Sequence, residues 1–509
     1  MVLSIDVAFV HRFTVDDSYI TLRYSRNVAN GVGAVYNATG ARAEGYTSFL
    51  WMELLALAHL VTPDALVVAK ALGVVFTFAT CALIGFWAFI ETSGRAVRVL
   101  AAGAAMAGYA ALPRTAIHAV SGMETALFTT LLTSTFFVAA RLVRDGPRWA
   151  MPFAVLALAS AVTRPEASLA VGVVTLGSLL MLPRDAALRT LVTVVLVCAL
   201  PLVAYELWRL HYYGLPLPLP FYVKLASPGA FAGAEPVMTW LASELRFAIP
   251  LVLLLRAPPR HLRPVLAATL SLVLFFVLPQ HLMGYDSRYL SPVDPTMCML
   301  FGLGVGRLFG DAPIGFVRNG NVSSPYFSRA AAVIVGFVVP AAFSVVEAPA
   351  AFRERLDYAD GLAEAHERLG RDLAALHVTN PRLATSDAGA VPYLSGWWTL
   401  DLIGLNDAKI ATTGSRDPDA ILANAPDVLV LISTEPDHFI PYDWNAFELP
   451  IYDKALAAGF TRVDLRRFAS DYWLWVLVRR GFTARLPGPQ LSLTEATGPG
   501  TGSAASRSE

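Results

Sequence analysis

The sequence predicts a mainly α-helical, polytopic membrane bundle with a small C-terminal α/β or α+β domain. The 509 residues are 55% hydrophobic and only 15% charged, whereas soluble domains contain about 25% charged residues. Their mean hydropathy is +0.53. Apolar runs near membrane-span length follow one another from residue 66 to residue 346. From about residue 351 the hydropathy falls, and short β-type runs bounded by Pro and Gly begin.

The N-terminal segment, residues 1–64, is expected to hold two short helices. Its first ten residues are apolar but interrupted by Asp6, and they are too few for a span of about 20 residues. Either the chain starts outside the bilayer, or the first span lies upstream of this start. Residues 17–30 predict an amphipathic helix. Residues 46–60 are apolar but few, which predicts a helix along the membrane interface.

Residues 65–348 are expected to form the transmembrane bundle. Residues 66–90 are the first clear span. Further hydrophobic runs near the needed length bring the expected total to about ten or eleven spans. They are residues 99–112, 123–140, 149–163, 167–182, 188–207, 237–255, 265–283, 289–305 and 330–346.

Arginines occupy every second loop between these runs. Because cytoplasmic loops are enriched in Lys and Arg, the arginine loops are expected on the cytoplasmic side. The other loops carry the unusual polar motifs, at residues 16–17, 121–125, 163–166, 211–224 and 285–289. We therefore expect these motifs, together with the C-terminal domain, on the extracytoplasmic face.

Residues 349–485 are expected to form a soluble domain. They begin with a predicted helix at residues 356–377 and continue with predicted strands at 382–385, 427–432, 461–466 and 472–478. The remaining residues, 486–509, have the composition of a disordered tail. Cys81, Cys198 and Cys298 each lie in an apolar run, which indicates core residues rather than a disulfide or metal framework.

Adjacent carboxylates, Asp16 and Asp17, stand at the head of the first predicted helix. A carboxylate within hydrogen-bond distance can accept the proton of an attacking hydroxyl. The second carboxylate could orient the first, bind substrate hydroxyls or share a metal, for which Mg²⁺ or Mn²⁺ would be suitable. A base needs no metal, however, and no cofactor is clearly required. The structural alternative is a helix cap with a solvated neighbour.

Cations on the same set of loops could neutralise a phosphate leaving group. The candidates are Arg23, Arg164, Lys224 and Arg288. A single interfacial Arg is more often a snorkelling anchor, so the group carries more weight than any one member. The equal numbers of basic and acidic residues, 39 of each, give no reason to expect a nucleic-acid partner.

Glu124 and Glu166 stand at the starts of hydrophobic spans, where carboxylates are costly and therefore suggest function. The alternatives are stabilisation of a helix N-terminus by Glu124 and pairing of Glu166 with Arg164. Further candidates for substrate binding are carboxylates or rings that could contact a sugar, although membrane interfaces are enriched in Tyr and Trp in any case. They are Glu44, Tyr46, His211 and Tyr212.

These motifs resemble a bacterial branch of the polyprenyl-phosphate-dependent glycosyltransferases of the C superfamily (GT-C). The chain is most similar to the cell-wall arabinofuranosyltransferases that add terminal residues. The resemblance rests on D-D-S-Y-I-T-L-R-Y-S-R-N, G-V-G-A-V-Y-N and E-G-Y-T-S-F-L-W, and continues through S-G-M-E-T-A-L-F, T-R-P-E, Y-Y-G, F-Y-V-K-L and S-R-Y-L-S-P. It extends into D-A-G-A-V-P-Y-L-S-G and L-D-L-I-G-L-N-D.

The resemblance implies an enzyme of a bacterial inner membrane that moves a sugar, with arabinofuranose as one candidate. The donor would be a polyprenyl-phosphate sugar, and the acceptor a cell-envelope glycan or lipid. It also implies two membrane-parallel helices in the first outer loop and an outer-loop Asp, here Asp16 or Asp17, as general base in an inverting transfer. Two departures stand out: the span that precedes the Asp pair in relatives is missing, and Leu219-Pro220-Phe221 replaces their P-N-T.

One alternative function is a scaffold protein whose outer domain binds wall polymer; the other is a transporter or flippase of lipid-linked glycans. Buried charges and aromatic side chains would then line a translocation route. Few charges lie at mid-span, however, and the polar motifs gather on one face. This distribution favours the transferase.

Overall fold

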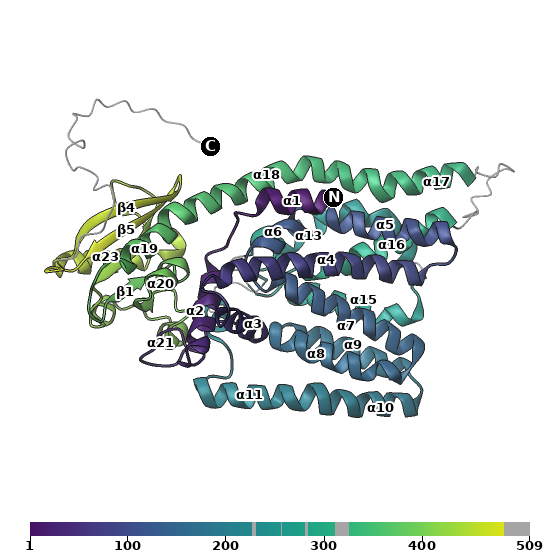
Figure 1. Cartoon of the computed structure of the whole chain (residues 1–509), viewed down its shortest axis with the longest axis horizontal. Coiled ribbons are helices and arrows are strands. Elements are labelled where there is room, and N and C mark those ends of the chain that lie inside the picture. Colours follow the sequence, from purple (N-terminus) through teal and green to yellow (C-terminus); the bar gives the residue numbers. More distant parts are fainter. Residues whose placement is uncertain (226–230, 256, 280–283, 311–324, 483–509) are drawn as a thin grey trace.

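The computed structural model describes residues 1–225, 231–255, 257–279, 284–310 and 325–482. Helices lie side by side in a bundle, and a mixed sheet with its own helices covers one end of that bundle (Figure 1). The predicted tail, residues 486–509, is outside the described residues. The predicted fold class, a helical membrane bundle with a small C-terminal sheet domain, is confirmed.

The N-terminal segment contains α1 (Val2–Val10), α2 (Asp17–Ala29) and α3 (Phe49–His59). Helix α2 matches the predicted helix, and the left-handed Gly31 (φ 73°) follows its end. Helix α3 matches the predicted short apolar helix and packs against α2. These two helices lie where the bundle meets the sheet domain (Figure 1).

The apolar runs of residues 65–348 fold into the bundle around a large core that includes the fully buried rings of Trp87, Phe136 and Phe301. Its helices are α4 (Ala65–Glu91), α5 (Arg95–Ala110), α6 (Pro113–Val120), α7 (Thr125–Asp145), α8 (Ala150–Thr163), α9 (Ala167–Met181), α10 (Arg184–Val194), α11 (Leu200–Tyr213), α12 (Leu219–Leu225), α13 (Ala234–Glu244), α14 (Ala248–Leu255), α15 (Arg263–Phe275), α16 (Asp294–Gly310) and α17 (Pro325–Val333).

By length and composition, four helices in the described ranges could cross a membrane: α4, α7, the continuous helix Arg184–Tyr213 and the helix Arg329–Ala374. Helices α5 and α6 make a fifth if that pair, bent by 64°, is counted as one span. The other predicted spans are helical but shorter or broken. For example, residues 237–255 divide into α13, a 3₁₀ turn and α14. The predicted total of about ten or eleven is therefore not reached by this criterion.

The last bundle helix runs directly into the C-terminal domain (Figure 1). It is continuous over Arg329–Ala374, 46 residues. Within it, α18 (Val339–Gly361) passes through a π-helical turn, Leu362–Glu367, into α19 (Arg368–Ala374). The helix predicted at residues 356–377 is thus the end of a much longer one.

The sheet has five strands in the order β2-β1-β3-β5-β4. Strand β1 pairs in parallel with β2 and β3, whereas β5 pairs antiparallel with β3 and β4. The strands are β1 (Arg382–Thr385), β2 (Trp398–Asp401), β3 (Val428–Ser433), β4 (Thr461–Ala469) and β5 (Tyr472–Val478). The helices are α20 (Ala390–Ser395), α21 (Ala408–Thr413), α22 (Pro418–Leu422) and α23 (Glu448–Ala457). Strand β2 was not predicted.

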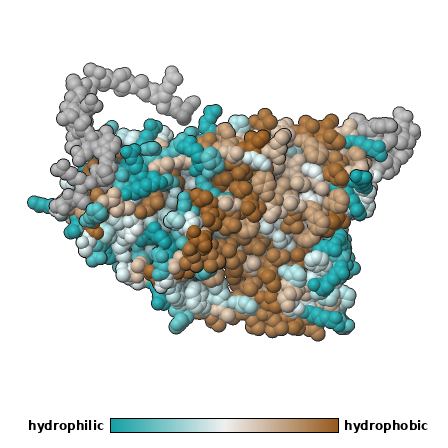
Figure 2. Space-filling view, viewed as in Figure 1, coloured by the Kyte–Doolittle hydropathy of each residue, from teal (hydrophilic) through white to brown (hydrophobic). Residues whose placement is uncertain are grey.

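The surface agrees with a membrane-embedded bundle. Figure 2 shows an apolar band between two hydrophilic ends, one of which is the sheet domain. The α4–α5 and α9–α10 connections, which carry predicted cytoplasmic arginines, lie at the end opposite the sheet (Figure 1). These two arginine connections and the sheet domain therefore lie at opposite ends of the bundle, as the alternation of arginine loops predicts.

Candidate active site

A cavity of about 1140 Å³ lies between the N-terminal segment, the bundle and the C-terminal domain. Its walls include both members of the predicted Asp pair and residues from loops far apart in the sequence. Six predicted site residues line it: Asp16, Asp17, Tyr46, Glu124, Arg164 and Arg288. The structure thus brings together the acids and two of the cations that the sequence suggested.

One part of the cavity wall is a buried network of charges. The carboxylate oxygen Oε1 of Glu124 accepts hydrogen bonds from Nη1 of Arg164 (2.6 Å) and Nη2 of Arg288 (3.0 Å). Burial by itself would raise the pKa of Glu124, but the charges of Arg288 and Arg164 outweigh it and lower this pKa to about 2. Glu124 therefore stays ionised and fixes two guanidinium groups beside the cavity.

The same network extends to two further acids. Arg164 pairs with Glu166 at 2.6 Å, the contact that the structural alternative for Glu166 predicted. Glu166 does not line the cavity among the described residues. Nη1 of Arg288 lies 4.0 Å from Oδ2 of Asp17, so the second member of the Asp pair faces a guanidinium. A phosphate at this wall would meet charges that are already held in place.

Asp16 has a different environment from its neighbour. It occupies the N-cap position of α2, but its side chain makes no capping hydrogen bond. Its Oδ1 instead accepts the backbone N–H of Ala390, in the C-terminal domain, at 2.8 Å. Burial raises the pKa of the Asp16 carboxyl well above its ordinary value, with His366 acting in the opposite direction. The simple cap that was the structural alternative therefore does not describe Asp16.

The C-terminal domain adds acid–base groups that sequence reasoning missed. Nε2 of His366 lies 2.6 Å from Oδ2 of Asp387, and the hydroxyl of Tyr472 donates to both oxygens of Asp387, at 3.0 and 2.8 Å. All three residues line the cavity. The motif D-A-G-A carried a signal for Asp387, but a lone His in a long helix carried none.

Arg23 lies outside this cavity. Its guanidinium donates to the backbone carbonyls of Tyr36 (2.7 Å) and Trp397 (2.7 Å), and also to that of Pro392. It is buried, with 4% of its surface exposed. Arg23 therefore attaches α2 to the C-terminal domain, which disagrees with the predicted role in phosphate binding.

Glu44 is also occupied elsewhere. Both of its carboxylate oxygens accept from Arg209, Oε1 from Nε at 2.8 Å and Oε2 from Nη2 at 2.6 Å. This buried bidentate pair joins the first loop to α11. His211, on the same helix, is exposed and does not line the cavity. Neither Glu44 nor His211 is placed to bind a substrate near Asp16.

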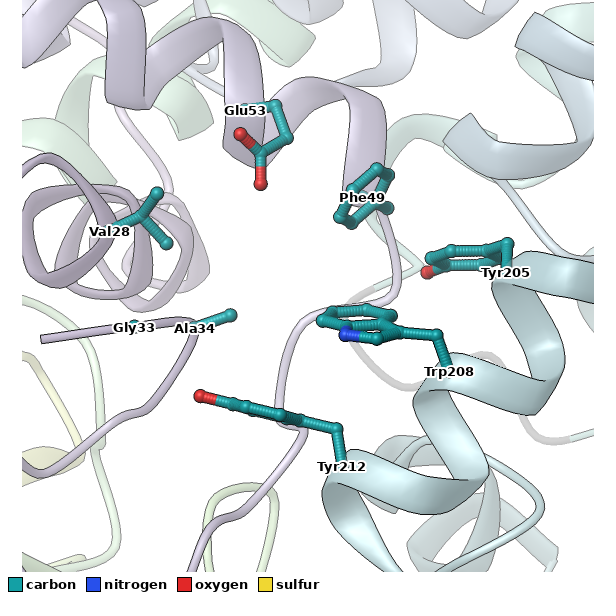
Figure 3. Close-up of a pocket in the computed structure, with 8 residues that line it drawn as sticks. All are labelled: Val28, Gly33, Ala34, Phe49, Glu53, Tyr205, Trp208 and Tyr212. Carbon is teal, nitrogen blue, oxygen red and sulfur yellow. The ribbon is translucent and has the colours of Figure 1, made fainter. Parts of the chain in front are cut away.

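Tyr212 lines a separate aromatic cleft of about 380 Å³ (Figure 3). The ring of Trp208 stacks between those of Tyr205 and Tyr212, and the guanidinium of Arg42 lies over Tyr212 at 4.2 Å. Tyr212 is therefore not at the Asp pair. Lys224 falls at the end of α12, and its side chain is outside the described residues.

A possible metal site was also predicted at the Asp pair. Within the described ranges, no group of three or more His, Cys, Asp or Glu side chains is arranged to hold a metal ion. The Asp16 carboxylate accepts a hydrogen bond from the N–H of Ala390, whereas the Asp17 carboxylate lies 4.0 Å from the guanidinium of Arg288. Arg288 supplies positive charge close to Asp17.

Comparisons with known proteins agree with this architecture. Residues 357–478 match a domain of unknown function (DUF8728). The chain is 31% identical over 279 residues to the terminal beta-(1->2)-arabinofuranosyltransferase of Mycobacterium tuberculosis, covering 50% of this chain and 43% of that protein. The enzyme of the same name from Corynebacterium glutamicum is 32% identical over 240 residues, 43% of this chain and 34% of that protein. The chain thus spans less than half the length of these relatives.

A solved structure shares the fold over nearly the whole chain. It is ArnT from Cupriavidus metallidurans bound to undecaprenyl phosphate, with a TM-score of 0.59, 13% identity, and coverage of 93% of this chain and 96% of ArnT. At this identity the likeness concerns the fold alone. The resemblance expected from the motifs is confirmed: the chain has the fold of the membrane-embedded GT-C glycosyltransferases and is similar in sequence to terminal arabinofuranosyltransferases.

Proposed function

We propose that this protein is an integral-membrane glycosyltransferase that uses a polyprenyl-phosphate sugar, with arabinofuranose as the first candidate. The acceptor is a hydroxyl of a cell-envelope glycan or lipid. The observation that carries this proposal is that Asp16 and the guanidinium groups of Arg164 and Arg288 line the same cavity. The names of the sequence relatives support the sugar and the reaction class.

In this proposal Asp16 is the general base. Its Oδ1 is held by the N–H of Ala390, so Oδ2 is the oxygen that accepts the acceptor's hydroxyl proton. Burial raises the pKa of Asp16 towards neutrality, which suits a base that works near pH 7. As the proton moves to Oδ2, the acceptor oxygen forms a bond to the anomeric carbon.

The bond between that carbon and the phosphate oxygen breaks in the same step, and the electron pair leaves with the phosphate. Arg288 and Arg164 stabilise the negative charge that develops there. Glu124 keeps the two guanidinium groups in position. Asp17, 4.0 Å from Arg288, is placed to orient that arginine or a sugar hydroxyl. A base and a leaving group on opposite sides of the carbon give inversion.

The proposed location is the outer face of a bacterial inner membrane, with the cavity and the sheet domain extracytoplasmic. The support is the positive-inside rule applied to the arginine connections at the opposite end of the bundle. Val32, 43% exposed beside α2, offers a test by substitution with cysteine. The native cysteines are buried. A membrane-impermeant maleimide added to intact spheroplasts should label Val32→Cys, and protection until lysis would contradict the sidedness.

The activity test uses the full chain in lipid nanodiscs. The probe donor is labelled polyprenyl-phosphoryl arabinofuranose, and the probe acceptor is a soluble arabinofuranosyl oligosaccharide. Asp16→Asn should lower kcat by about 10²–10⁴-fold, the usual contribution of a general base. Asp357→Asn, an exposed carboxylate on α18, serves as the matched control. Wild-type turnover in Asp16→Asn would overturn the proposed base, and NMR of the product's anomeric proton checks inversion.

A further inference from the structure

We infer that the C-terminal domain is part of the catalytic centre: its Asp387–Ala390 loop fixes Asp16, and its His366 is the positioning residue that places a charge beside that carboxylate. This inference rests on the proposed function, in which Asp16 is the base. The residues involved fall within the matched domain of unknown function, residues 357–478. It therefore gives that domain a chemical role in sugar transfer.

The first support is the fit of the loop around Asp16. The N–H of Ala390 donates to Oδ1 of Asp16 at 2.8 Å. A Cβ added to Gly389 would come within 2.2 Å of both the backbone oxygen and Oδ2 of Asp16, so only glycine can approach so closely. On its other side, the N–H of Asp16 donates to the hydroxyl of Tyr358 at 3.2 Å. Asp16 is thus held between α18, which contacts its backbone, and the loop after β1, which contacts its carboxylate.

The second support is the state of His366. Its side chain is buried, with 2% exposed, and Nε2 faces the carboxylate of Asp387 at 2.6 Å. The other nitrogen, Nδ1, is buried without a hydrogen-bond partner among the described residues. His366 lies in the π-helical turn Leu362–Glu367, and such turns are frequent at functional sites. A buried His–Asp pair with one unsatisfied nitrogen at a cavity wall is costly unless that nitrogen is used.

The third support is electrostatic. Burial is the main reason why the pKa of Asp16 is raised; the charge of His366 lowers it, and the charges of Asp387 and Asp17 raise it. The phenol groups of other elements also face this carboxyl and interact with it: Tyr19, Tyr36, Tyr358 and Tyr472. The charge of His366 and the hydrogen bond from the N–H of Ala390 therefore both favour the ionised, proton-accepting form of Asp16, and His366 is the titratable group of the two.

A purely structural role is the competing explanation, since the pair of His366 and Asp387 also joins the long helix to the sheet domain. The two roles differ in their dependence on pH. If His366 only supports packing, its replacement lowers turnover equally at every pH. If it keeps Asp16 ionised, its replacement shifts the ionisation of the base, and turnover returns at alkaline pH.

The test compares pH profiles of kcat for the wild type and His366→Gln in nanodiscs, with the probe donor and acceptor described above. The acid limb should move up by about one pH unit or more, which is a tenfold loss near pH 7, with recovery to within about twofold of the wild type near pH 9. His377→Gln, an exposed histidine just beyond α19, is the matched control and should leave the profile unchanged. A loss that is equal at all pH values, or an unchanged profile, overturns the inference.

A second measurement does not depend on turnover. The thermal midpoints of Asp16→Asn, His366→Gln and the double variant form a double-mutant cycle. Non-additive shifts in the midpoint are expected because the two charges interact, and additive shifts would overturn the inference. Activity in Asp16→Asn at the wild-type level would instead remove the proposed base, while the cycle would still report whether His366 and Asp16 interact.

Discussion

Replacement of Gly389 by alanine tests the contact between the C-terminal domain and the proposed base. The added Cβ would lie 2.2 Å from Oδ2 of Asp16 and 2.4 Å from its Cγ. Ordinary contacts at a Cβ begin at 3.4 Å, so the loop must withdraw by about 1.2 Å. The hydrogen bond from Ala390 to Asp16, now 2.8 Å, then exceeds normal hydrogen-bond distance.

The expected cost has two parts. Loss of a hydrogen bond to a charged group destabilises the protein by about 1.5–3 kcal/mol, and a misplacement of about 1 Å at a reacting group lowers turnover by about 100-fold. The assay is kcat in nanodiscs together with the thermal midpoint. Gly172→Ala, at a helical glycine with nothing within 4 Å, is the matched control and should keep both values. Wild-type turnover in Gly389→Ala would refute the tight contact.

Four further outcomes are expected. Glu124→Gln removes the carboxylate that two buried guanidinium groups share, leaving Arg164 with Glu166 and Arg288 with Asp17 at 4.0 Å, so denaturant unfolding should show a loss of about 3–5 kcal/mol; a loss below about 1 kcal/mol would contradict the network. Arg288→Gln should lower kcat by about 10²–10³-fold through lost stabilisation of the leaving phosphate, and a change confined to the acceptor KM would argue against that role. Arg209→Gln should lower the thermal midpoint by breaking the bidentate pair with Glu44. The pH profile of kcat, measured on the protein that remains folded, should stay the same. Chelation by EDTA should leave turnover unchanged, since arginines supply the positive charge, and a loss that Mg²⁺ or Mn²⁺ restores would establish a divalent cation.

The pH dependence of the wild type follows from the raised pKa of Asp16. A base must be deprotonated, so kcat should rise with pH through an acid limb near neutrality rather than near pH 4. The linked stability has the opposite sign, because a carboxyl whose pKa is raised by folding favours the folded state at low pH and loses this contribution as pH rises. A profile flat from pH 5 to pH 8 would exclude Asp16 as the base.

Much of the fold was predictable because the bilayer and the sheet impose simple patterns. Helix α4 and strands β1 and β5 were placed within about one residue from hydropathy and turn signals alone. Strand β2 was missed although it has the same length, four residues, as β1, which was found. Residues 237–255 were predicted as one span because their hydropathy is continuous. In the structure the buried charges Glu244 and Arg246 lie where α13 ends and the chain turns into α14.

The site was predictable only where charge stood out against an apolar background. Asp17, Glu124 and Arg288 were found because each acid or cation borders hydrocarbon, and Asp17 is 4.0 Å from Arg288 in the structure. Arg23 and Glu44 carried the same signal but are satisfied by backbone carbonyls and by another side chain, which depends on tertiary contacts. Those contacts cannot be read from spacing along the chain.

The 46-residue helix Arg329–Ala374 has a mechanical consequence. At 1.5 Å per residue it is about 69 Å long, and it connects the apolar bundle to His366 at the cavity wall, with Pro349 and the π-helical turn Leu362–Glu367 along its course. Removing one residue between Val346 and Arg355 would turn everything beyond it by about 100° and draw it in by about 1.5 Å. The number of residues in this helix therefore determines the height and the rotation of His366 at the cavity wall.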